Sequence, residues 1–109
     1  MKDNENKEYL LRVKEEIVNY YDGFTDEDGE EKGLYDYLSD ILDFEITINS
    51  RFEYSSCKVW ITLGGPNVWI DTSSHEIKLA WGGEKESVWL WSQICDEIDS
   101  YFEEIYNCR

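Results

Sequence analysis

Residues 85–108, KESVWLWSQICDEIDSYFEEIYNC, form the segment around which we expect the rest of the chain to pack. Its apolar residues recur at alternating spacings of three and four positions, which is the pattern of a helix with one buried face. This predicted apolar face consists of Val88, Trp91, Cys95, Ile98, Phe102 and Ile105. The other faces carry carboxylates, namely Asp96, Glu97, Asp99, Glu103 and Glu104. No Lys or Arg lies between Lys85 and Arg109 to pair with them, so we expect a long C-terminal helix that displays unpaired acidic side chains.

The composition indicates one folded domain, residues 1–109, with a strong negative charge. A chain of 109 residues with 41% apolar content has room for one core, and 16% aromatic residues argue against disorder. Ten Lys and Arg against 25 Asp and Glu give a formal net charge of −15. Because such a surface repels polyanions, direct binding to DNA, RNA or anionic membranes is not expected.

The cysteines and the N-terminus favour a cytoplasmic protein. Cys57, Cys95 and Cys108 are odd in number and have no CxxC spacing, which is typical of reduced thiols rather than of a disulfide framework. The first residues, MKDNENKEYL, are polar, and no apolar run approaches the ~18 residues of a membrane span. We therefore expect neither a targeting segment nor a membrane anchor.

The N-terminal part predicts two helices separated by an acidic loop. Residues 6–22 have a helical apolar face, and a second, shorter helical pattern covers residues 33–42. The intervening segment TDEDGEEK contains five acidic residues, Asp26, Glu27, Asp28, Glu30 and Glu31. A calcium loop centred on Gly29 would place Phe24 and Tyr35 where carboxylate ligands are required, so we interpret the segment as a solvated loop.

The central part predicts antiparallel strands. Alternating apolar residues from Phe44 to Tyr54 predict one long strand, for which 49–50 is a candidate bend. Three further strands are expected at 58–63, 68–72 and 76–81, and their short connections require antiparallel neighbours. The predicted fold is α+β: two N-terminal helices, a four-stranded antiparallel β meander that ends at 82–83, and the long C-terminal helix packed on the sheet.

Alternation also assigns the two faces of the predicted sheet. The apolar face, which the C-terminal helix is expected to cover, carries Val59, Ile61, Leu63, Val68, Ile70, Ile77, Leu79 and Trp81. The opposite face carries Trp60 and Trp69 on adjacent strands, where they can form a cross-strand pair. We expect the N-terminal helices to cover this pair. The alternative is that Trp60 and Trp69 form an exposed platform for a partner.

No motif in the chain predicts catalysis, a cofactor or a metal. His75 is the only histidine, and although Ser73 and Ser74 are nearby, the sequence shows no third group to orient a base. A single histidine without a cysteine pair does not provide the usual zinc ligands. Residues 64–66 are followed by a strand rather than by a helix N-terminus, so they predict a turn and not a phosphate loop. We therefore expect a protein that is not an enzyme.

Two segments, GGPNVWIDT at 64–72 and YFEEIYNC at 101–108, resemble those of small acidic proteins encoded on phages and conjugative elements of Gram-positive bacteria. That group is similar in size and charge to antirestriction and anti-CRISPR proteins. The quoted motifs are turns and helix ends, so the resemblance assigns no functional residue. It implies an inhibitor of a nucleic-acid-binding defence protein.

Two functions follow from these patterns. In the first, the acidic side chains mimic DNA or RNA and occupy the basic groove of a CRISPR nuclease or restriction enzyme. Asp96, Asp99 and Glu103 would form a row at phosphate-like intervals, since helix positions three or four apart are ~5–6 Å apart, and the loop acids would extend this row if the loop lies nearby. In the second, the Trp60 and Trp69 face binds a protein or a second copy of the chain, and the acidity only maintains solubility.

Overall fold

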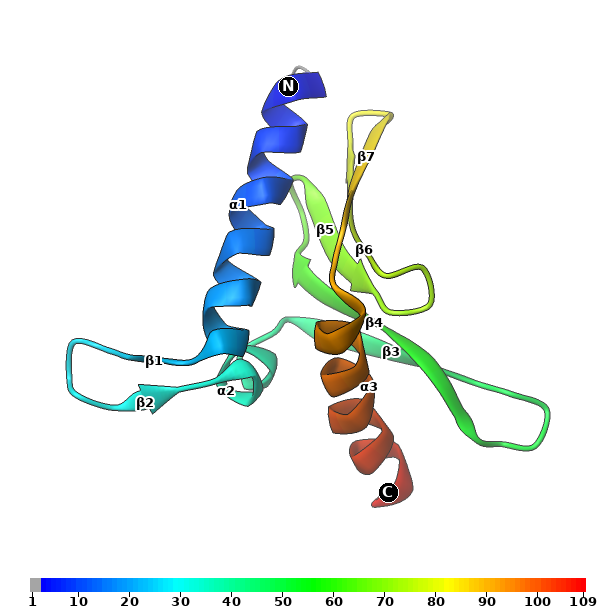
Figure 1. Cartoon of the computed structure of the whole chain (residues 1–109). Helices are drawn as coiled ribbons and strands as arrows, with labels where there is room; N and C mark the ends of the chain where they lie inside the picture. The colour runs from blue at the N-terminus through cyan, green and yellow to red at the C-terminus, as the bar shows by residue number, and fades with distance from the viewer. Residues whose placement is uncertain (1–2) are drawn as a thin grey trace.

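The computed structural model describes residues 3–109, which form an α+β fold (Figure 1). The helices are α1 (Asp3–Asp22), α2 (Leu34–Ser39) and α3 (Ser92–Asn107). A small hairpin consists of β1 (Phe24–Thr25) and β2 (Glu31–Lys32). The main sheet consists of β3 (Asp43–Ile48), β4 (Tyr54–Thr62), β5 (Asn67–Asp71), β6 (Glu76–Trp81) and β7 (Glu84–Trp89). Within this part of the chain, no helix is long and apolar enough to cross a membrane.

The main sheet is a five-stranded meander in which each strand pairs antiparallel with its neighbour in the sequence. The predicted four-stranded sheet is therefore wrong. Residues 85–89 belong to β7 and not to the C-terminal helix, which begins at Ser92. The cause is the Gly82-Gly83 turn, which joins Trp81 directly to its register partner Glu84. Both glycines have positive φ, 57° and 84°, which suits a two-residue hairpin between twisted strands.

The predicted long strand from Phe44 to Tyr54 is also wrong, because the chain reverses within it. β3 and β4 are joined by a tight turn in which the Asn49 side chain replaces strand hydrogen bonds. Its Oδ1 accepts from the backbone N–H of Arg51 at 2.9 Å and of Glu53 at 3.1 Å. Phe52 has a positive φ of 61°, which completes the reversal. The second N-terminal helix is shorter than the predicted range 33–42, since α2 covers only the six residues Leu34–Ser39.

The core lies between one face of the sheet and all three helices. The sheet contributes the buried residues Cys57, Val59, Val68, Ile70, Ile77, Leu79 and Val88. The helices and the link between β7 and α3 contribute Leu10, Val13, Ile17, Leu34, Leu38, Leu90, Ile94, Cys95, Ile98 and Phe102. The predicted burial of one sheet face is thus confirmed for Val59, Val68, Ile70, Ile77 and Leu79. Leu63, Trp81, Trp91 and Ile105, however, are exposed although the patterns assigned them to the buried faces.

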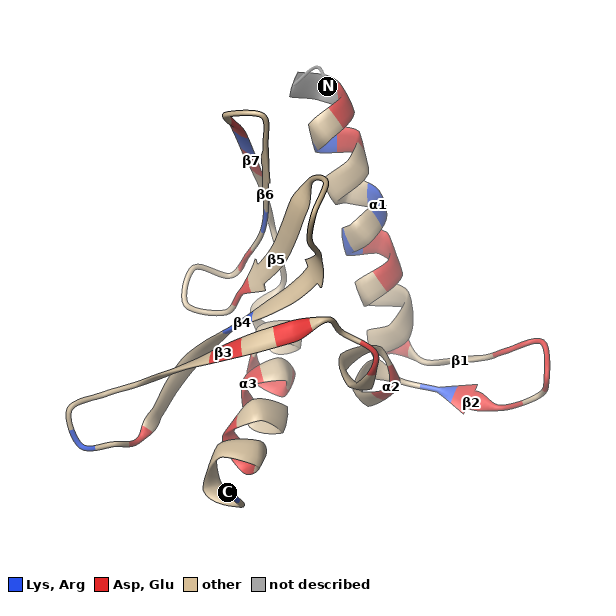
Figure 2. Cartoon of the chain, turned by 180° about the vertical axis from the view of Figure 1, so that it is seen from behind, with Lys and Arg blue, Asp and Glu red and all other residues tan. Residues whose placement is uncertain are grey.

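The two edges of the sheet differ. At β7, Lys7 of α1 donates from Nζ to the carbonyl oxygen of Ser87 at 3.0 Å, and Asn6 donates from Nδ2 to Glu84 Oε2 at 2.9 Å. Helix α1 therefore covers part of the β7 edge. At β3, the other edge strand, the described part of the chain places no further strand or helix along the outer side (Figure 2).

Candidate partner-binding surfaces

Helix α3 presents an acidic ridge, which we define as Asp96, Glu97, Glu103 and Glu104. The packing of Ile98 and Phe102 against the sheet turns these four side chains into solvent, and all four are exposed. Among the described residues, none of the four carboxylates forms an ion pair or a side-chain hydrogen bond. The C-terminal part of α3, which carries Glu103 and Glu104, extends beyond the strands (Figure 1). The acidic ridge is therefore free to meet cations of a partner.

Asp99 is not part of the acidic ridge, because its carboxylate accepts a hydrogen bond that joins α3 to β4. Tyr54 Oη of β4 donates a hydrogen bond to Asp99 Oδ1 at 2.6 Å, and the carboxylate is only partly exposed. Burial, together with this hydrogen bond, raises the pKa of Tyr54 well above its usual range, so the phenol remains a donor. The structure thus separates the predicted row: Asp96 and Glu103 remain available, seven positions and ~10 Å apart along the helix axis, and Asp99 anchors α3 to the sheet.

The acidic segment between α1 and α2 is an ordered hairpin rather than the expected loop. Asp26 Oδ1 accepts from the backbone N–H of Asp28 and of Glu30, both at 2.9 Å. Lys32 Nζ lies 3.4 Å from Glu30 Oε2 and 3.9 Å from Asp26 Oδ2. Two of the five predicted acidic residues are therefore paired, while Glu27, Asp28 and Glu31 are exposed. The hairpin projects away from α3 in both views, so it does not extend the acidic ridge (Figures 1 and 2).

Sequence reasoning missed three carboxylates that lie closer to α3 than the hairpin does. Asp40 follows α2, and Asp43 and Glu45 lie on β3; all three are exposed. Helix α2 adjoins α3, since the Tyr35 and Tyr101 rings are 5.1 Å apart. The predicted strand begins at Phe44, after Asp43, and no sequence motif marks these carboxylates as a site.

The second candidate surface is the sheet face opposite the helices, with Trp60 and Trp69 at its centre. The two residues are direct register partners, and their rings are 4.9 Å apart with an interplanar angle of 33°. The predicted cross-strand pair is confirmed. The expected cover by the N-terminal helices is wrong, because all three helices contribute to the core on the other face. Seen from behind, no helix of the described chain lies in front of β4 or β5 (Figure 2).

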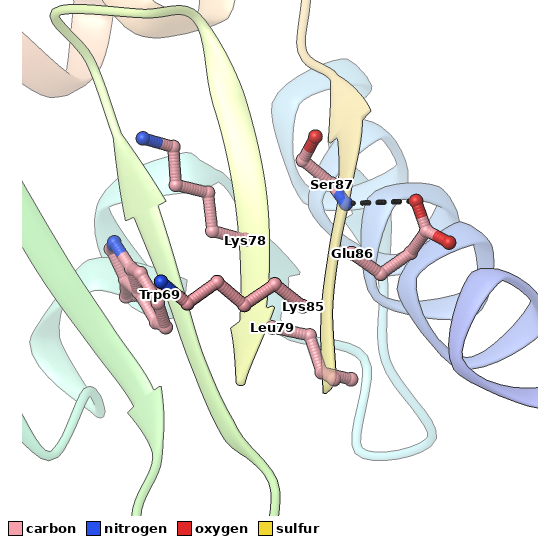
Figure 3. Close-up of a pocket in the computed structure, with 6 residues that line it drawn as sticks. All are labelled: Trp69, Lys78, Leu79, Lys85, Glu86 and Ser87. Carbon is pink, nitrogen blue, oxygen red and sulfur yellow. Dashed lines mark hydrogen bonds between the residues drawn. The ribbon is translucent and has the colours of Figure 1, made fainter. Parts of the chain in front are cut away.

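Lysine side chains border this aromatic pair. Trp69, Lys78 and Lys85 line a shallow depression of about 370 Å³, and Lys85 reaches across β6 toward Trp69 (Figure 3). The open sheet face thus combines aromatic surface with cations in a chain that is otherwise acidic.

The turn between β5 and β6 is held by Asp71. Its Oδ1 accepts from the backbone N–H of Ser73 at 3.0 Å and from Ser73 Oγ at 2.6 Å, and its Oδ2 lies 3.3 Å from Lys78 Nζ. Burial alone would raise the pKa of Asp71, but the hydrogen bonds from Ser73 and Lys78 outweigh it, so the pKa lies below its usual value. His75 has a positive φ of 55° and its ring lies edge-on to Trp89, 5.5 Å away. These contacts give the turn a structural role.

Residues 3–109 contain no group of three or more His, Cys, Asp or Glu side chains placed to hold a metal ion. Comparisons with protein-family models, with curated proteins and with solved structures find no match to this chain. The resemblance of residues 64–72 and 101–108 to small acidic proteins of phages and conjugative elements therefore stays a prediction from the sequence.

Proposed function

We propose that this protein is an acidic inhibitor of a nucleic-acid-binding host defence protein and acts by placing its acidic ridge in a basic groove. The observation that carries the proposal is that Asp96, Glu97, Glu103 and Glu104 are exposed, fixed on a packed helix and without ion pairs among the described residues. Proteins that bind DNA contact its phosphates mainly through Lys and Arg. A rigid row of carboxylates can satisfy the same cations, and CRISPR nucleases and restriction enzymes are the target classes we infer.

The free state of all three cysteines supports a reducing compartment for this activity, and we place the protein in the cytoplasm. Cys57 and Cys95 are buried in the core on β4 and α3.

The test is neutralisation of the ridge with a control matched in charge. Asp96→Asn, Glu97→Gln, Glu103→Gln and Glu104→Gln together remove four charges from α3 while Asp99 stays intact. The control converts four exposed carboxylates of α1, Glu5, Glu8, Glu15 and Glu16, to Gln. Both variants have the same net charge. The assay is DNA cleavage by a panel of CRISPR nucleases and restriction enzymes, with association rates measured at low and high salt for any enzyme inhibited by the parent.

The ridge variant should associate more slowly and show a weaker salt dependence, because complementary charge mainly accelerates encounter. The α1 control should inhibit like the parent. Equal inhibition by the parent and the ridge variant, or equal loss in both variants, would show that the ridge is not the contact surface.

A second candidate function is supported by the absence of a helix over the Trp60 and Trp69 pair in the described chain. In this alternative, the open sheet face binds a protein partner and the acidity maintains solubility. Binding would then vary little with salt and would be lost in Trp69→Ala. The ridge variant would bind normally, which separates the two candidates in one series of measurements.

A further inference from the structure

Strand β3 is an open edge of the sheet and is also its most exposed strand. Five of its six residues are exposed, and the sixth, Ile46, is partly buried. An edge strand directs about half of its backbone N–H and C=O groups away from the sheet, where they can pair with another extended chain. Proteins that need a closed edge protect it with a lysine, a proline or a covering helix. β7 has such protection from α1 and Lys7, whereas β3 contains no Lys or Pro.

The side chains of β3 alternate between polar and apolar, with Asp43, Glu45 and Thr47 at the polar positions. Asp43 and Glu45 share the open face with Trp60 and Lys58, their register partners on β4. Phe44 and Ile48 are on the helix side, where the Phe44 ring lies 4.8 Å from that of Phe102. A strand added beside β3 would follow the same pleat. Its side chains would alternately meet carboxylates on one face and apolar groups on the other.

A groove lies on the helix side of this edge, at the junction of α2, β3 and α3. Its volume is about 300 Å³, and its lining includes Leu42, Phe44 and Ile105. These three side chains are large and exposed, at 61%, 38% and 40%. Exposed apolar side chains that gather around a groove are typical of a protein-binding site. The groove can receive an apolar side chain from a strand paired with β3.

We propose that β3 binds an extended segment of a partner protein as a sixth strand, and that this segment alternates Lys or Arg with large apolar residues. Backbone pairing supplies affinity, and alternate side chains supply selectivity, as in other cases of strand addition. Opposite charges across neighbouring strands stabilise the pair, so Asp43 and Glu45 select basic side chains. A second copy of this chain is a poorer occupant, since each copy carries a formal net charge of −15. The inference is independent of the acidic ridge on α3.

The first experiment uses a capped eight-residue peptide that alternates Lys and Val. Binding is followed by amide chemical shifts and hydrogen exchange of the ¹⁵N-labelled full chain. Slower exchange is expected at the outward-facing amides of residues 43–48. The controls are a peptide of identical composition with four Lys followed by four Val, and a peptide that alternates Glu and Val. Equal binding of the block peptide, or protection confined to α3, would overturn the proposal, because either result would indicate charge attraction without strand pairing.

The second experiment reverses the charge of the edge. Asp43→Lys with Glu45→Lys should weaken binding of the Lys/Val peptide about tenfold or more and strengthen binding of the Glu/Val peptide. The matched control, Glu8→Lys with Glu15→Lys, changes the net charge equally on exposed positions of α1 and should alter neither affinity by more than about twofold.

Two further results would overturn the proposal. One is equal weakening by the β3 variant and the α1 variant. The other is a dimer of the peptide-free protein, seen by sedimentation and abolished by the β3 variant, which would assign the edge to a second copy.

Discussion

Replacing Phe102 by Ala tests the docking of α3, on which both the core and the acidic ridge depend. Phe102 is 1% exposed, and its ring lies 4.8 Å from the ring of Phe44. Removing a buried Phe side chain usually costs about 3–5 kcal/mol through lost transfer energy and the cavity left behind. We expect the lower part of this range, about 3 kcal/mol, because Phe44 is partly exposed and Phe102 also borders the groove beside α2. The vacated space can therefore partly collapse or admit water.

A loss of this size is large compared with the stability of a small domain, typically 5–15 kcal/mol. The midpoint of thermal unfolding should fall by at least about 10 °C. Urea unfolding followed by tryptophan fluorescence gives the free energy directly, and the slope m should stay unchanged. The matched control is Ile105→Ala, one turn further along α3, where the side chain is 40% exposed and the cost should stay below about 1 kcal/mol. If Phe102→Ala is no less stable than Ile105→Ala, α3 does not depend on this contact.

Three other predictions concern the hydrogen bond from Tyr54, the pKa of Asp71 and the reactivity of the cysteines. Tyr54→Phe removes the hydroxyl that donates the 2.6 Å hydrogen bond to Asp99 of α3. This change should lower the free energy of unfolding, measured by urea titration, by about 1.5–3 kcal/mol. The pKa of Asp71 is lowered in the folded state, so its stabilisation is complete above the unfolded pKa of ~3.9 and is lost as pH falls through the folded pKa. Asp71→Asn should therefore lower the free energy of unfolding at pH 7. As the pH is lowered, the free energy of unfolding of this variant should fall less steeply than that of the parent. Burial raises the pKa of Cys57 to about 11 and of Cys95 to about 12, so at pH 8 iodoacetamide should modify exposed Cys108 first and the other two only after unfolding.

The alternation of apolar residues predicted the buried face of the sheet correctly. A shift of one residue would turn all the apolar side chains of a strand toward solvent, so the pattern strongly specifies which face is buried. Val59, Val68, Ile70, Ile77 and Leu79 are all buried as expected. The cross-strand pairing of the two central tryptophans followed from the same alternation. Local patterns therefore identified the central strands and the buried face of the sheet, but they placed the N-terminal helices on the wrong face.

The errors occurred where two kinds of pattern overlap in the sequence. Val88 is buried in β7 and Cys95 in α3, and their spacing through Trp91 happens to fit a helix. The useful signal was Gly82-Gly83, since two glycines between strand-like segments favour a hairpin. The Asn49 turn inside the predicted long strand was a similar signal, because an Asn side chain can replace backbone hydrogen bonds.

The candidate sites were predicted in part. The sequence showed which carboxylates of α3 avoid the apolar stripe, and four of the five are exposed. The role of Asp99 depends on Tyr54, which is 45 positions away in the sequence, and no local pattern contains that contact. The predicted meander already places its first strand at an edge of the sheet, but the expected strand from Phe44 to Tyr54 merges β3 with the turn that follows it.

The position of α3 after all five strands has a consequence for synthesis in the cell. The meander can pair progressively as the ribosome releases it, since every pairing joins neighbours in the sequence. Its apolar face, however, lacks Ile94, Ile98 and Phe102 until α3 emerges. During that interval the nascent chain exposes both an apolar sheet face and the open β3 edge. A chain that ends before residue 92 should therefore leave part of the apolar sheet face without its cover.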